Sequence, residues 1–507
     1  MAATALPRFD LPALGRFLAE ASGASHVEID GLELLAGGAI QENWGLDARF
    51  SGGLLAGAQP LVLRTDAATG IPSSLSRVEE FAVLQAAFAA GVTVPEPLWA
   101  CADPGIIGKP FFVMRRLAGT AQGRQITGEP ALEAALPAIA ERLGRELARL
   151  QTIRPPRPDL AFLPAIDAQR HIATCRAYLD RHPAPRPVLE WALRWAATHL
   201  PEPAAPVLCH RDFRTGNYLL DGTRLTGLLD WEFAGWGDPD EDIGWFCCKG
   251  WRFARLDRAA GGIAERAPFY DGYESASGRR LDPERVHFWE VLANIRWAVI
   301  ALQQSDRYLI GGARDLSTAI IGRRASECDL ELLMLLDPAG AAQATPSPPP
   351  GERVWVRGPL PTPSPVRGLP PAATLSRNTG EGLNLRDLPA GIVLLALGRE
   401  WLLDELLPLL PEERHRELRL VATAMAIAER EAMAGDAPAH DLAKRLAEFY
   451  GGAADGLLRR FASDLRAGAF ETCEPRARAA CAILWRLTMM KLREGNPTFL
   501  AANGFGE

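Results

Sequence analysis

Short runs of alternating apolar and polar residues fill the first quarter of the chain and predict a small β-rich unit. Strands are expected within residues 26–116, including 60–64 and 111–116. Residues 76–90 instead carry apolar side chains at helical spacing. The pattern therefore predicts several strands interrupted by one helix.

The helix predicted over 76–90 has start and stop signals of its own. Ser76 followed by Glu79 three residues later is the pattern of a capping box, and Gly91 supplies a stop. Because Glu79 is used at the start of the helix, Glu80 is free to face inward.

The next two hundred residues are predicted to be mainly helical. Apolar spacing indicates helices over 131–150, 171–181, 188–199, 245–255, 269–275, 286–304 and 313–336. One hairpin interrupts them, because two short apolar strands flank Asp221-Gly222, a dipeptide that favours a tight turn. Trp289, Trp297 and Tyr308 are interpreted as core in preference to an acceptor pocket, since aromatic residues at helical spacing are usually buried.

A proline-rich segment is predicted to separate two folded units. Eleven prolines lie between Pro338 and Pro371, and the stretch up to residue 384 has no apolar period that could build a core. Helices are expected again over 392–410, 414–434, 441–450, 454–467 and 475–491, as in an all-α bundle. The predicted domains are 1–117, 118–337, a disordered linker at 338–384, and 385–507.

Composition narrows the class of protein. With 507 residues and 48% apolar content the chain can bury several cores. A net charge of −7 offers no basic field for nucleic acid. The eight cysteines form no CxxC pair, and we find neither a membrane-length apolar run nor a signal pattern. A cytoplasmic protein with reduced thiols is expected.

The candidate chemistry is concentrated in residues 207–245. An apolar pair leads into His210-Arg211-Asp212, Asn217 opens the first strand of the predicted hairpin, and Asp230 closes the second. Folding the hairpin places Asn217 and Asp230 at the open end where the Asp212 loop also lies. Three oxygen-bearing side chains are therefore expected to converge.

Such a set suits phosphoryl transfer from a nucleotide. Mg²⁺ must neutralise the charge of the transferred group while a carboxylate positions the attacking hydroxyl, and Mg²⁺ prefers oxygen ligands. Asp212 is the candidate base, and Asn217 and Asp230 are the candidate metal ligands. The five-residue spacing of Asp212 and Asn217 resembles the catalytic loop of protein kinases.

The following residues resemble a narrower family. Asp230-Trp231-Glu232 replaces the Asp-Phe-Gly of protein kinases, and Gly237-Asp238-Pro239 and Asp242 follow, as in the aminoglycoside phosphotransferase and choline kinase-like family. The resemblance implies a two-lobed protein-kinase-like α+β fold that uses ATP and Mg²⁺. His210 is expected to support the loop structurally.

The segment after the hairpin is expected to be architectural. Asp238 is predicted to be the N-cap of a helix with Pro239 in its first turn and Glu241 three residues on. Asp238 and Asp242 are therefore assigned no part in the chemistry.

The same resemblance assigns roles in the first lobe. Gly37 and Gly38 would let the backbone approach phosphates, although a simple hairpin is the alternative. Arg64 stands where kinases keep a phosphate-binding lysine, with a strand-end arginine exposed to solvent as the alternative. Glu80 would hold Arg64, and the backbone from Met114 onward would contact adenine.

The acceptor is expected to be a hydroxyl group on a small molecule. Arg64 and the stretch ANIRWAVIALQQSDRYL resemble the kinase-like domains joined to acyl-CoA dehydrogenases, which implies a hydroxyacyl-CoA. Aminoglycosides and choline-like alcohols stay open, as does a non-catalytic nucleotide-binding scaffold. A protein kinase is disfavoured because no Ala-Pro-Glu follows the Asp230 segment. LREGNPTFL resembles a bacterial helical domain of unknown function, for which a protein partner or self-association is expected.

Overall fold

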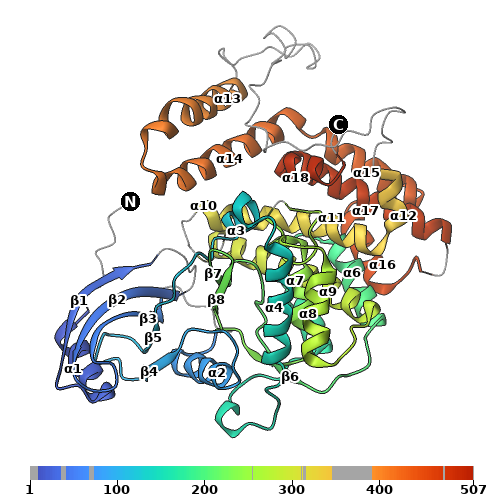
Figure 1. The fold of residues 1–507 in the computed structure, drawn as a ribbon. Coiled ribbons are helices and arrows are strands. Elements are labelled where there is room, and N and C mark those ends of the chain that lie inside the picture. Colours follow the sequence, from blue (N-terminus) through green and yellow to red (C-terminus); the bar gives the residue numbers. More distant parts are fainter. Residues whose placement is uncertain are drawn as a thin grey trace.

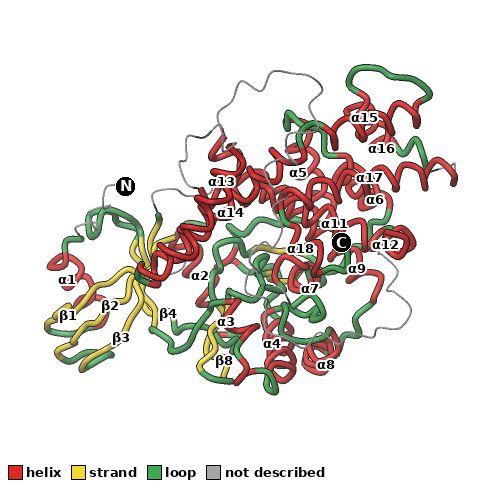
Figure 2. Tube along the Cα trace, turned by 90° about the horizontal axis from the view of Figure 1, so that it is seen from above, coloured by secondary structure: helices red, strands yellow, loops and turns green. Residues whose placement is uncertain are grey.

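The computed structural model describes residues 9–35, 41–67, 74–253, 255–309, 311, 316–344, 391–471 and 474–505. A five-stranded sheet and two helices gather at one end of the molecule, and the rest consists of helices with two short β-ribbons among them (Figures 1 and 2). The predicted α+β class with a helical C-terminal part is confirmed. None of the described helices is both long enough and apolar enough to cross a membrane.

The first lobe is an antiparallel five-stranded sheet with the strand order β1-β2-β3-β5-β4. Its elements are α1 (Leu11–Ser22), β1 (His26–Leu34), β2 (Gln41–Ser51), β3 (Gly57–Asp66), α2 (Arg77–Ala89), β4 (Pro97–Cys101) and β5 (Phe111–Arg115). Helix α1 was not predicted. Asp10 caps it by accepting the Ala13 N–H at 2.9 Å, and Gly23 ends it in a left-handed conformation.

Helix α2 begins as the sequence predicts. Ser76 accepts the backbone N–H of Glu79, and the Glu79 carboxylate accepts the N–H of Ser76 at 2.9 Å. The capping box uses the Glu79 side chain at the start of the helix. Glu80 is only 1% exposed and lies on the buried face of the helix. The helix thereby delivers one carboxylate toward the sheet.

The second lobe is mainly helical. Its helices are α3 (Gly123–Gly128), α4 (Leu136–Leu150), α5 (Ala168–Arg181), α6 (Pro187–Thr198), α7 (Glu241–Cys247), α8 (Arg266–Ser277), α9 (Pro283–Leu309), α10 (Leu316–Ile321), α11 (Ala325–Leu336) and α12 (Pro338–Ala344). Two short ribbons lie among them, formed by β6 (Val207–Cys209) with β9 (Gly235–Gly237) and by β7 (Tyr218–Asp221) with β8 (Arg224–Leu228).

Several predicted boundaries differ from the structure. The helix predicted over 313–336 is divided into α10, a 3₁₀ turn and α11, and the helix predicted over 392–410 ends at Trp401. The helix expected over 131–150 begins only at Leu136, because a 3₁₀ turn at Pro130–Leu132 precedes it. The helix expected over 245–255 ends at Cys247 and is followed by a 3₁₀ turn, Lys249–Trp251. Residues 338–344 form α12, whereas the rest of the predicted linker up to 384 lies outside the described residues.

The catalytic candidates lie at the ends of the two ribbons. In the β7–β8 hairpin Tyr218 pairs with Leu228 and Asp221 with Arg224, so the chain turns through Gly222. The Leu229 N–H donates to the Asn217 carbonyl at 2.8 Å, which extends the pairing by one residue at the open end. Asn217 therefore lies at the open end of the hairpin, as the sequence predicts.

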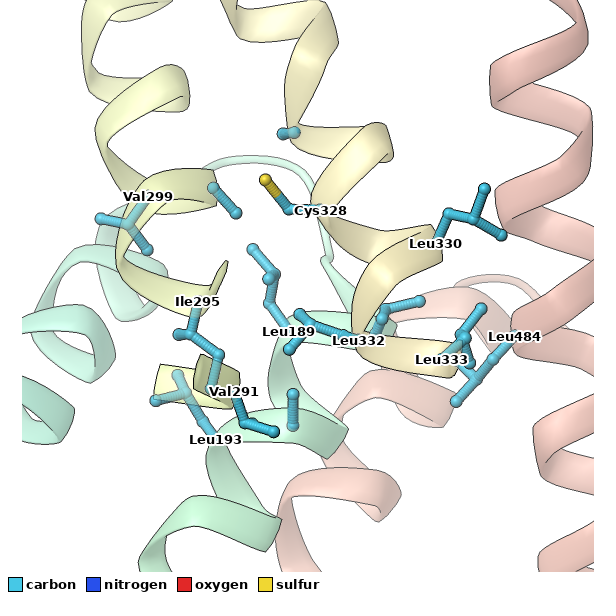
Figure 3. Packing of buried hydrophobic residues seen from close by; sticks show 14 of the residues in the cluster. Leu189, Leu193, Val291, Ile295, Val299, Cys328, Leu330, Leu332, Leu333 and Leu484 are labelled. Carbon is cyan, nitrogen blue, oxygen red and sulfur yellow. The ribbon is translucent and has the colours of Figure 1, made fainter. Parts of the chain in front are cut away.

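The C-terminal helices are α13 (Gly391–Trp401), α14 (Glu412–Ala434), α15 (Ala437–Tyr450), α16 (Leu457–Ala467), α17 (Glu474–Gly495) and α18 (Pro497–Ala502). Residues of α15, α16, α17 and α18 belong to a hydrophobic core that also includes the second lobe. Figure 3 shows the common cluster, with Leu189 and Leu193 from α6, Val291, Ile295 and Val299 from α9, Cys328, Leu330, Leu332 and Leu333 from α11, and Leu484 from α17.

Polar contacts reinforce this junction. The Trp485 indole donates to the Asp337 carboxylate at 2.9 Å, and the Asn496 side chain donates to Glu327 at 2.9 Å. The C-terminal helices are therefore packed onto the second lobe through apolar and polar contacts as well as being linked to it by the chain.

We expect the second lobe and the C-terminal helices to unfold together. Replacing the buried Ile483 with valine should lower the free energy of unfolding by about 0.5–1.5 kcal/mol, because one methylene leaves the shared core. Urea unfolding followed by tryptophan fluorescence and by circular dichroism should give one coincident transition. Val421→Ala on an exposed part of α14 is the control, and a separate early transition for the C-terminal helices would contradict the shared core.

Candidate active site

Arg64 on β3 joins the two lobes through buried ion pairs. Its Nε donates to Glu80 Oε2 at 3.1 Å, its Nη2 lies 2.6 Å from Asp230 Oδ1, and its Nη1 donates to Asn43 Oδ1 at 3.2 Å. Burial alone would lower the pKa of Arg64, but the carboxylates of Glu80 and Asp230 raise it above its ordinary value. The guanidinium is thus a fixed, buried cation that joins the first lobe to the Asp230 segment.

Asp230 occupies a backbone conformation that few residues adopt. Its φ is +69°, in the left-handed region that Asp and Asn tolerate better than most side chains. Burial would raise the pKa of its carboxyl group, whereas Arg64 lowers it and the net shift is downward. The structure therefore favours a carboxylate at this point.

Glu232 ties the Asp230 segment to the first lobe. Its Oε2 accepts hydrogen bonds from Gln41 Nε2 at 2.9 Å and from Ser74 Oγ at 2.6 Å. Burial and the neighbouring Asp230 raise the pKa of Glu232. Gln41 is the first residue of β2, so this contact connects the sheet of the first lobe to the segment that carries the candidate metal ligand.

Asp212 is surrounded by hydrogen-bond donors. Asn217 Nδ2 donates to its Oδ2 at 2.6 Å and to its backbone carbonyl at 2.9 Å. Trp245 Nε1 donates to Oδ1 at 3.0 Å, and Arg214 Nε donates to Oδ1 and Oδ2 at 3.0 and 3.1 Å. The carboxylate is therefore held in one orientation next to Asn217.

The loop that carries Asp212 has a strained backbone, which the buried Asp242 holds in place through hydrogen bonds. Arg211 has φ +63°, which costs about 1–2 kcal/mol for a residue with a side chain. Asp242 accepts the backbone N–H groups of His210 and Arg211, both at 2.7 Å. Burial and the neighbouring Glu241 raise the pKa of Asp242 to about 7, and the two N–H groups oppose that shift.

His210 supports the site without facing it. Its Nε2 lies 2.9 Å from the Leu229 carbonyl, and its Nδ1 accepts the Asp212 N–H at 3.3 Å. Burial lowers the pKa of His210, so the ring is neutral near pH 7. The ring links the Asp212 loop to the strand that leads into Asp230.

The predicted helix cap after the hairpin is wrong by two residues. Helix α7 begins at Glu241 with Asp240 at the N-cap position, whereas Asp238 accepts the Asp240 N–H at 2.9 Å in the turn before it. Glu241 does not form a capping box, because it is buried against Arg296, 2.8 Å away, and His171, 2.9 Å away. These contacts and Arg211 hold its pKa well below its usual value although burial opposes them.

The side-chain oxygens of Asn217 and Asp230 are better suited to binding Mg²⁺ than to binding a transition metal. Asn217 uses its Nδ2 on Asp212, and its side-chain oxygen has no hydrogen bond in the part of the chain that the structure describes. Asp230 likewise engages Arg64 through Oδ1. No cluster of three or more His, Cys, Asp or Glu residues suited to a metal occurs among the described residues. Mg²⁺ is usually bound by one or two protein oxygens, with phosphates and water as its other ligands. The side-chain oxygens of Asn217 and Asp230 fit this pattern.

The remaining predicted nucleotide contacts lie elsewhere. Gly37 and Gly38 fall in residues 36–40, outside the described residues. Met114 lies within β5, pairs with Val62 on one side and Pro97 on the other, and buries its side chain in the core. The backbone that follows β5 is a better candidate for adenine contacts than Met114 itself.

Sequence reasoning missed several residues of the site. Arg214 lies inside the candidate stretch, but its spacing of two from Asp212 did not reveal that its side chain turns back onto the carboxylate. Trp245 is 33 residues away from Asp212 and carries no local signal. Asn43 and Gln41 reach the site only because β2 lies beside β3 in the sheet.

Comparisons with known proteins agree with this geometry. A profile described as "Phosphotransferase enzyme family" (APH) matches residues 33–289, just over half of the chain. A domain of unknown function, DUF6285, matches residues 408–499.

Curated relatives match over shorter lengths. Acyl-CoA dehydrogenase family member 10 of Mus musculus is 29% identical over 207 residues, which are 38% of this chain and 18% of that protein. Family member 11 of Gallus gallus is 30% identical over 209 residues, 37% of this chain and 25% of that protein. The chain therefore spans about a quarter or less of these relatives.

A solved structure shows the same fold. A Ralstonia eutropha protein provisionally named an aminoglycoside phosphotransferase superposes with a TM-score of 0.52 at 22% identity, covering 65% of this chain and 98% of that one. At this identity the likeness concerns the fold alone.

Proposed function

Because this chain belongs to the phosphotransferase enzyme family, we propose that it transfers the γ-phosphate of ATP to a hydroxyl group of a small molecule in a Mg²⁺-dependent reaction. The family membership makes the chain a small-molecule phosphotransferase. The donor, the metal and the acceptor are the parts that we propose.

One observation carries the proposal. Arg64 from β3, Asp230 from the end of the β7–β8 hairpin and Glu80 from α2 form one ion-pair network that links the two lobes. Asp212 and Asn217 form a second hydrogen-bonded pair at the same end of that hairpin. A cation for phosphates, ligands for a metal and a base for a hydroxyl are the parts that phosphoryl transfer requires.

The residues divide the reaction between them. We assign Asp212 to hold the acceptor hydroxyl and take its proton as the oxygen forms a bond to the γ-phosphorus. The bond between that phosphorus and the β,γ-bridging oxygen breaks, ADP leaves, and Asp212 passes the proton to solvent. Arg64 neutralises the phosphates, and Glu80 fixes the direction of the guanidinium.

Asn217 and Asp230 are the residues that would hold Mg²⁺. When bound, the ion would supply positive charge that neutralises the phosphate oxygens. The hydrogen bonds from Asn217 to Asp212 keep the base at a fixed position relative to those ligands. Gly37 and Gly38 stay predicted phosphate contacts, and the backbone after Met114 a predicted adenine contact.

A hydroxyacyl-CoA is the acceptor that we propose first. Two of the matching relatives are named as acyl-CoA dehydrogenase family members, and the matched segment covers over a third of this chain. An enzyme of this kind would phosphorylate a hydroxyl on the acyl chain. Aminoglycosides and choline-like alcohols are the competing acceptors.

The test is acceptor-dependent consumption of ATP. Purified protein should convert ATP to ADP in the presence of Mg²⁺ and a hydroxyacyl-CoA, with a phosphorylated acyl product detected by mass spectrometry. Kanamycin, choline and a generic protein substrate form the competing panel. Binding of nucleotide without turnover by any acceptor would favour a regulatory scaffold and overturn the proposal.

Arg64 offers a test of the donor site. We expect Arg64→Met to raise the KM for ATP about 10- to 100-fold, because a charge-assisted contact to phosphate is lost. Arg64→Lys should restore part of the affinity, since it keeps the charge but not the planar group that also binds Glu80 and Asp230.

The matched control is Arg49→Met in the same sheet. Arg49 pairs with Asp30 on the exposed side of β2, at 3.5 Å, and should leave the KM for ATP unchanged. Equal KM values for wild type and Arg64→Met would remove Arg64 from the donor site.

A further inference from the structure

Both oxygens of the proposed base accept hydrogen bonds from other residues of the chain. Asp212 Oδ1 receives the Trp245 indole N–H at 3.0 Å, and Oδ2 receives the Asn217 amide at 2.6 Å. Arg214 Nε then bridges the two oxygens at 3.0 and 3.1 Å. A carboxylate has about four acceptor sites, and three N–H groups already use Asp212, so a hydroxyl reaches the base more freely when one of these donors moves.

Arg214 is the donor best placed to move. Its side chain is 24% exposed, compared with 13% for Asp212, whereas Trp245 and Asn217 are buried. A molecule that approaches Asp212 from solvent therefore meets the Arg214 guanidinium on its way.

The guanidinium has a support of its own. Its central carbon lies 4.7 Å from the centre of the Trp251 ring, and Nη1 donates to the Thr215 carbonyl at 3.4 Å. In the part of the chain that the structure describes, Asp212 is its one ion-pair partner. The stacked cation can stay over Trp251 while it exchanges Asp212 for another anion.

Two acids near these aromatic rings, among the described residues, are buried and already paired. Arg296 lies over the Trp245 ring at 4.9 Å, and its carboxylate partner is the buried Glu241. Glu290, beyond Trp251, is buried and paired with Arg252 at 3.0 Å. Among the described residues, Arg214 is the charged group that directly contacts Asp212, and Asp230, the nearby partly exposed carboxylate, is bound to Arg64.

We infer that Arg214 is a specificity-determining residue that covers Asp212 until an anionic group of the acceptor draws it away. The inference rests on the proposed function and narrows its acceptor to alcohols that carry a carboxylate or a phosphate. An incoming anion binds the guanidinium, Nε leaves the carboxylate, and Asp212 becomes available to the acceptor hydroxyl. Without an acceptor the same contact keeps water from using the base, which limits wasteful hydrolysis of ATP.

The acceptors for the test differ in one charged group at a time. The same hydroxyacyl group is offered as the coenzyme A thioester, as the neutral N-acetylcysteamine thioester and as the free hydroxy acid, and a cationic amino alcohol completes the set. The coenzyme supplies phosphates, the free acid supplies a carboxylate, and the neutral thioester supplies neither. Initial rates give kcat and KM for each acceptor, and phosphate release without acceptor gives the hydrolysis rate.

The variants are Arg214→Ala and Arg214→Lys, with Arg224→Ala as control. Arg224 is an exposed hairpin arginine that pairs with Asp221, so its replacement should change nothing. For Arg214→Ala we expect the KM for anionic acceptors to rise about 10- to 100-fold, the value of one charge-assisted hydrogen bond. The KM for the neutral thioester should stay within about twofold, and hydrolysis without acceptor should increase. Arg214→Lys should recover part of the affinity.

The acceptors for which Arg214→Ala raises the KM identify the anionic group that binds Arg214. A rise confined to the coenzyme A thioester assigns the phosphates, a rise confined to the free acid assigns the carboxylate, and either supports the inference. An equal loss with the neutral thioester, unchanged constants in Arg214→Ala, or a wild-type preference for the cationic amino alcohol would overturn it.

Folding and the proposed function are checked separately. Circular dichroism and calorimetric titration with Mg²⁺-ATP should give the same result for Arg214→Ala and the wild type. If the wild type transfers phosphate to no acceptor, the proposed function fails and this inference fails with it. If the wild type transfers phosphate but Arg214→Ala behaves identically, only the role of Arg214 is rejected.

Discussion

Replacing Asp212 with asparagine is expected to lower kcat for phosphoryl transfer about 10²- to 10⁴-fold, the range over which a general base contributes. The amide keeps the size of the side chain and can still accept hydrogen bonds from Asn217 or Trp245 through its oxygen. It cannot take the proton of the acceptor hydroxyl. Affinity for Mg²⁺-ATP should change little, because Arg64 and Asp230 form a separate network.

Two measurements separate this effect from misfolding. Steady-state rates with the best acceptor give kcat, and calorimetric titration with Mg²⁺-ATP shows whether the donor site is intact. Asp221→Asn is the matched control, since Asp221 is an exposed carboxylate in the same hairpin and pairs only with Arg224 among the described ion pairs. Full turnover by Asp212→Asn would remove Asp212 from its assigned role.

Replacing Asp230 with asparagine should remove most Mg²⁺-dependent activity. Loss of a charged ligand weakens the metal that neutralises the phosphates, a contribution of several kcal/mol, so turnover should fall about 10²- to 10³-fold. Asparagine is the better variant because it tolerates the left-handed backbone at this position, where φ is +69°. Asp230→Ala removes the same oxygen ligand but adds backbone strain.

The experiment compares nucleotide binding with and without Mg²⁺. In the wild type Mg²⁺ should strengthen ATP binding, and in Asp230→Asn that difference should disappear while metal-free binding through Arg64 persists. Asp238→Asn is a control in the same segment, because Asp238 lies in the turn before α7 and pairs with Arg285 at 2.7 Å. Retention of the full Mg²⁺ effect in Asp230→Asn would place the metal elsewhere.

The local elements were largely readable from the sequence. The capping box of Ser76 and Glu79 depends on residues three apart, and the hairpin around Gly222 depends on a turn dipeptide between apolar strands. Both signals lie within a few residues, so they are visible without knowledge of the fold. Helix ends were less reliable: the chain leaves the helix at Cys247, where the Lys249–Trp251 turn follows, and this depends on packing against α9 and α11.

The order and spacing of the motif residues also identified the family. They indicated Asp212 as the candidate base and Asn217 and Asp230 as the candidate metal ligands. The contact of Glu80 with Arg64 was expected from the resemblance, and the structure places the two side chains within hydrogen-bonding distance. Their roles in catalysis stay predictions until the variants are measured.

Only the tertiary structure decided what surrounds the base and what covers the second lobe. Arg214 and Trp245 donate to Asp212 because a loop and a distant helix meet there, and no sequence period encodes the direction of a loop side chain. Helices α15, α16, α17 and α18 share a core with α6, α9 and α11 because apolar faces far apart in the chain are complementary in space. The sequence determined which chemistry the chain carries, since that depends on residue types at short spacing. Access to that chemistry depends on long-range packing, which appears only when the chain is folded.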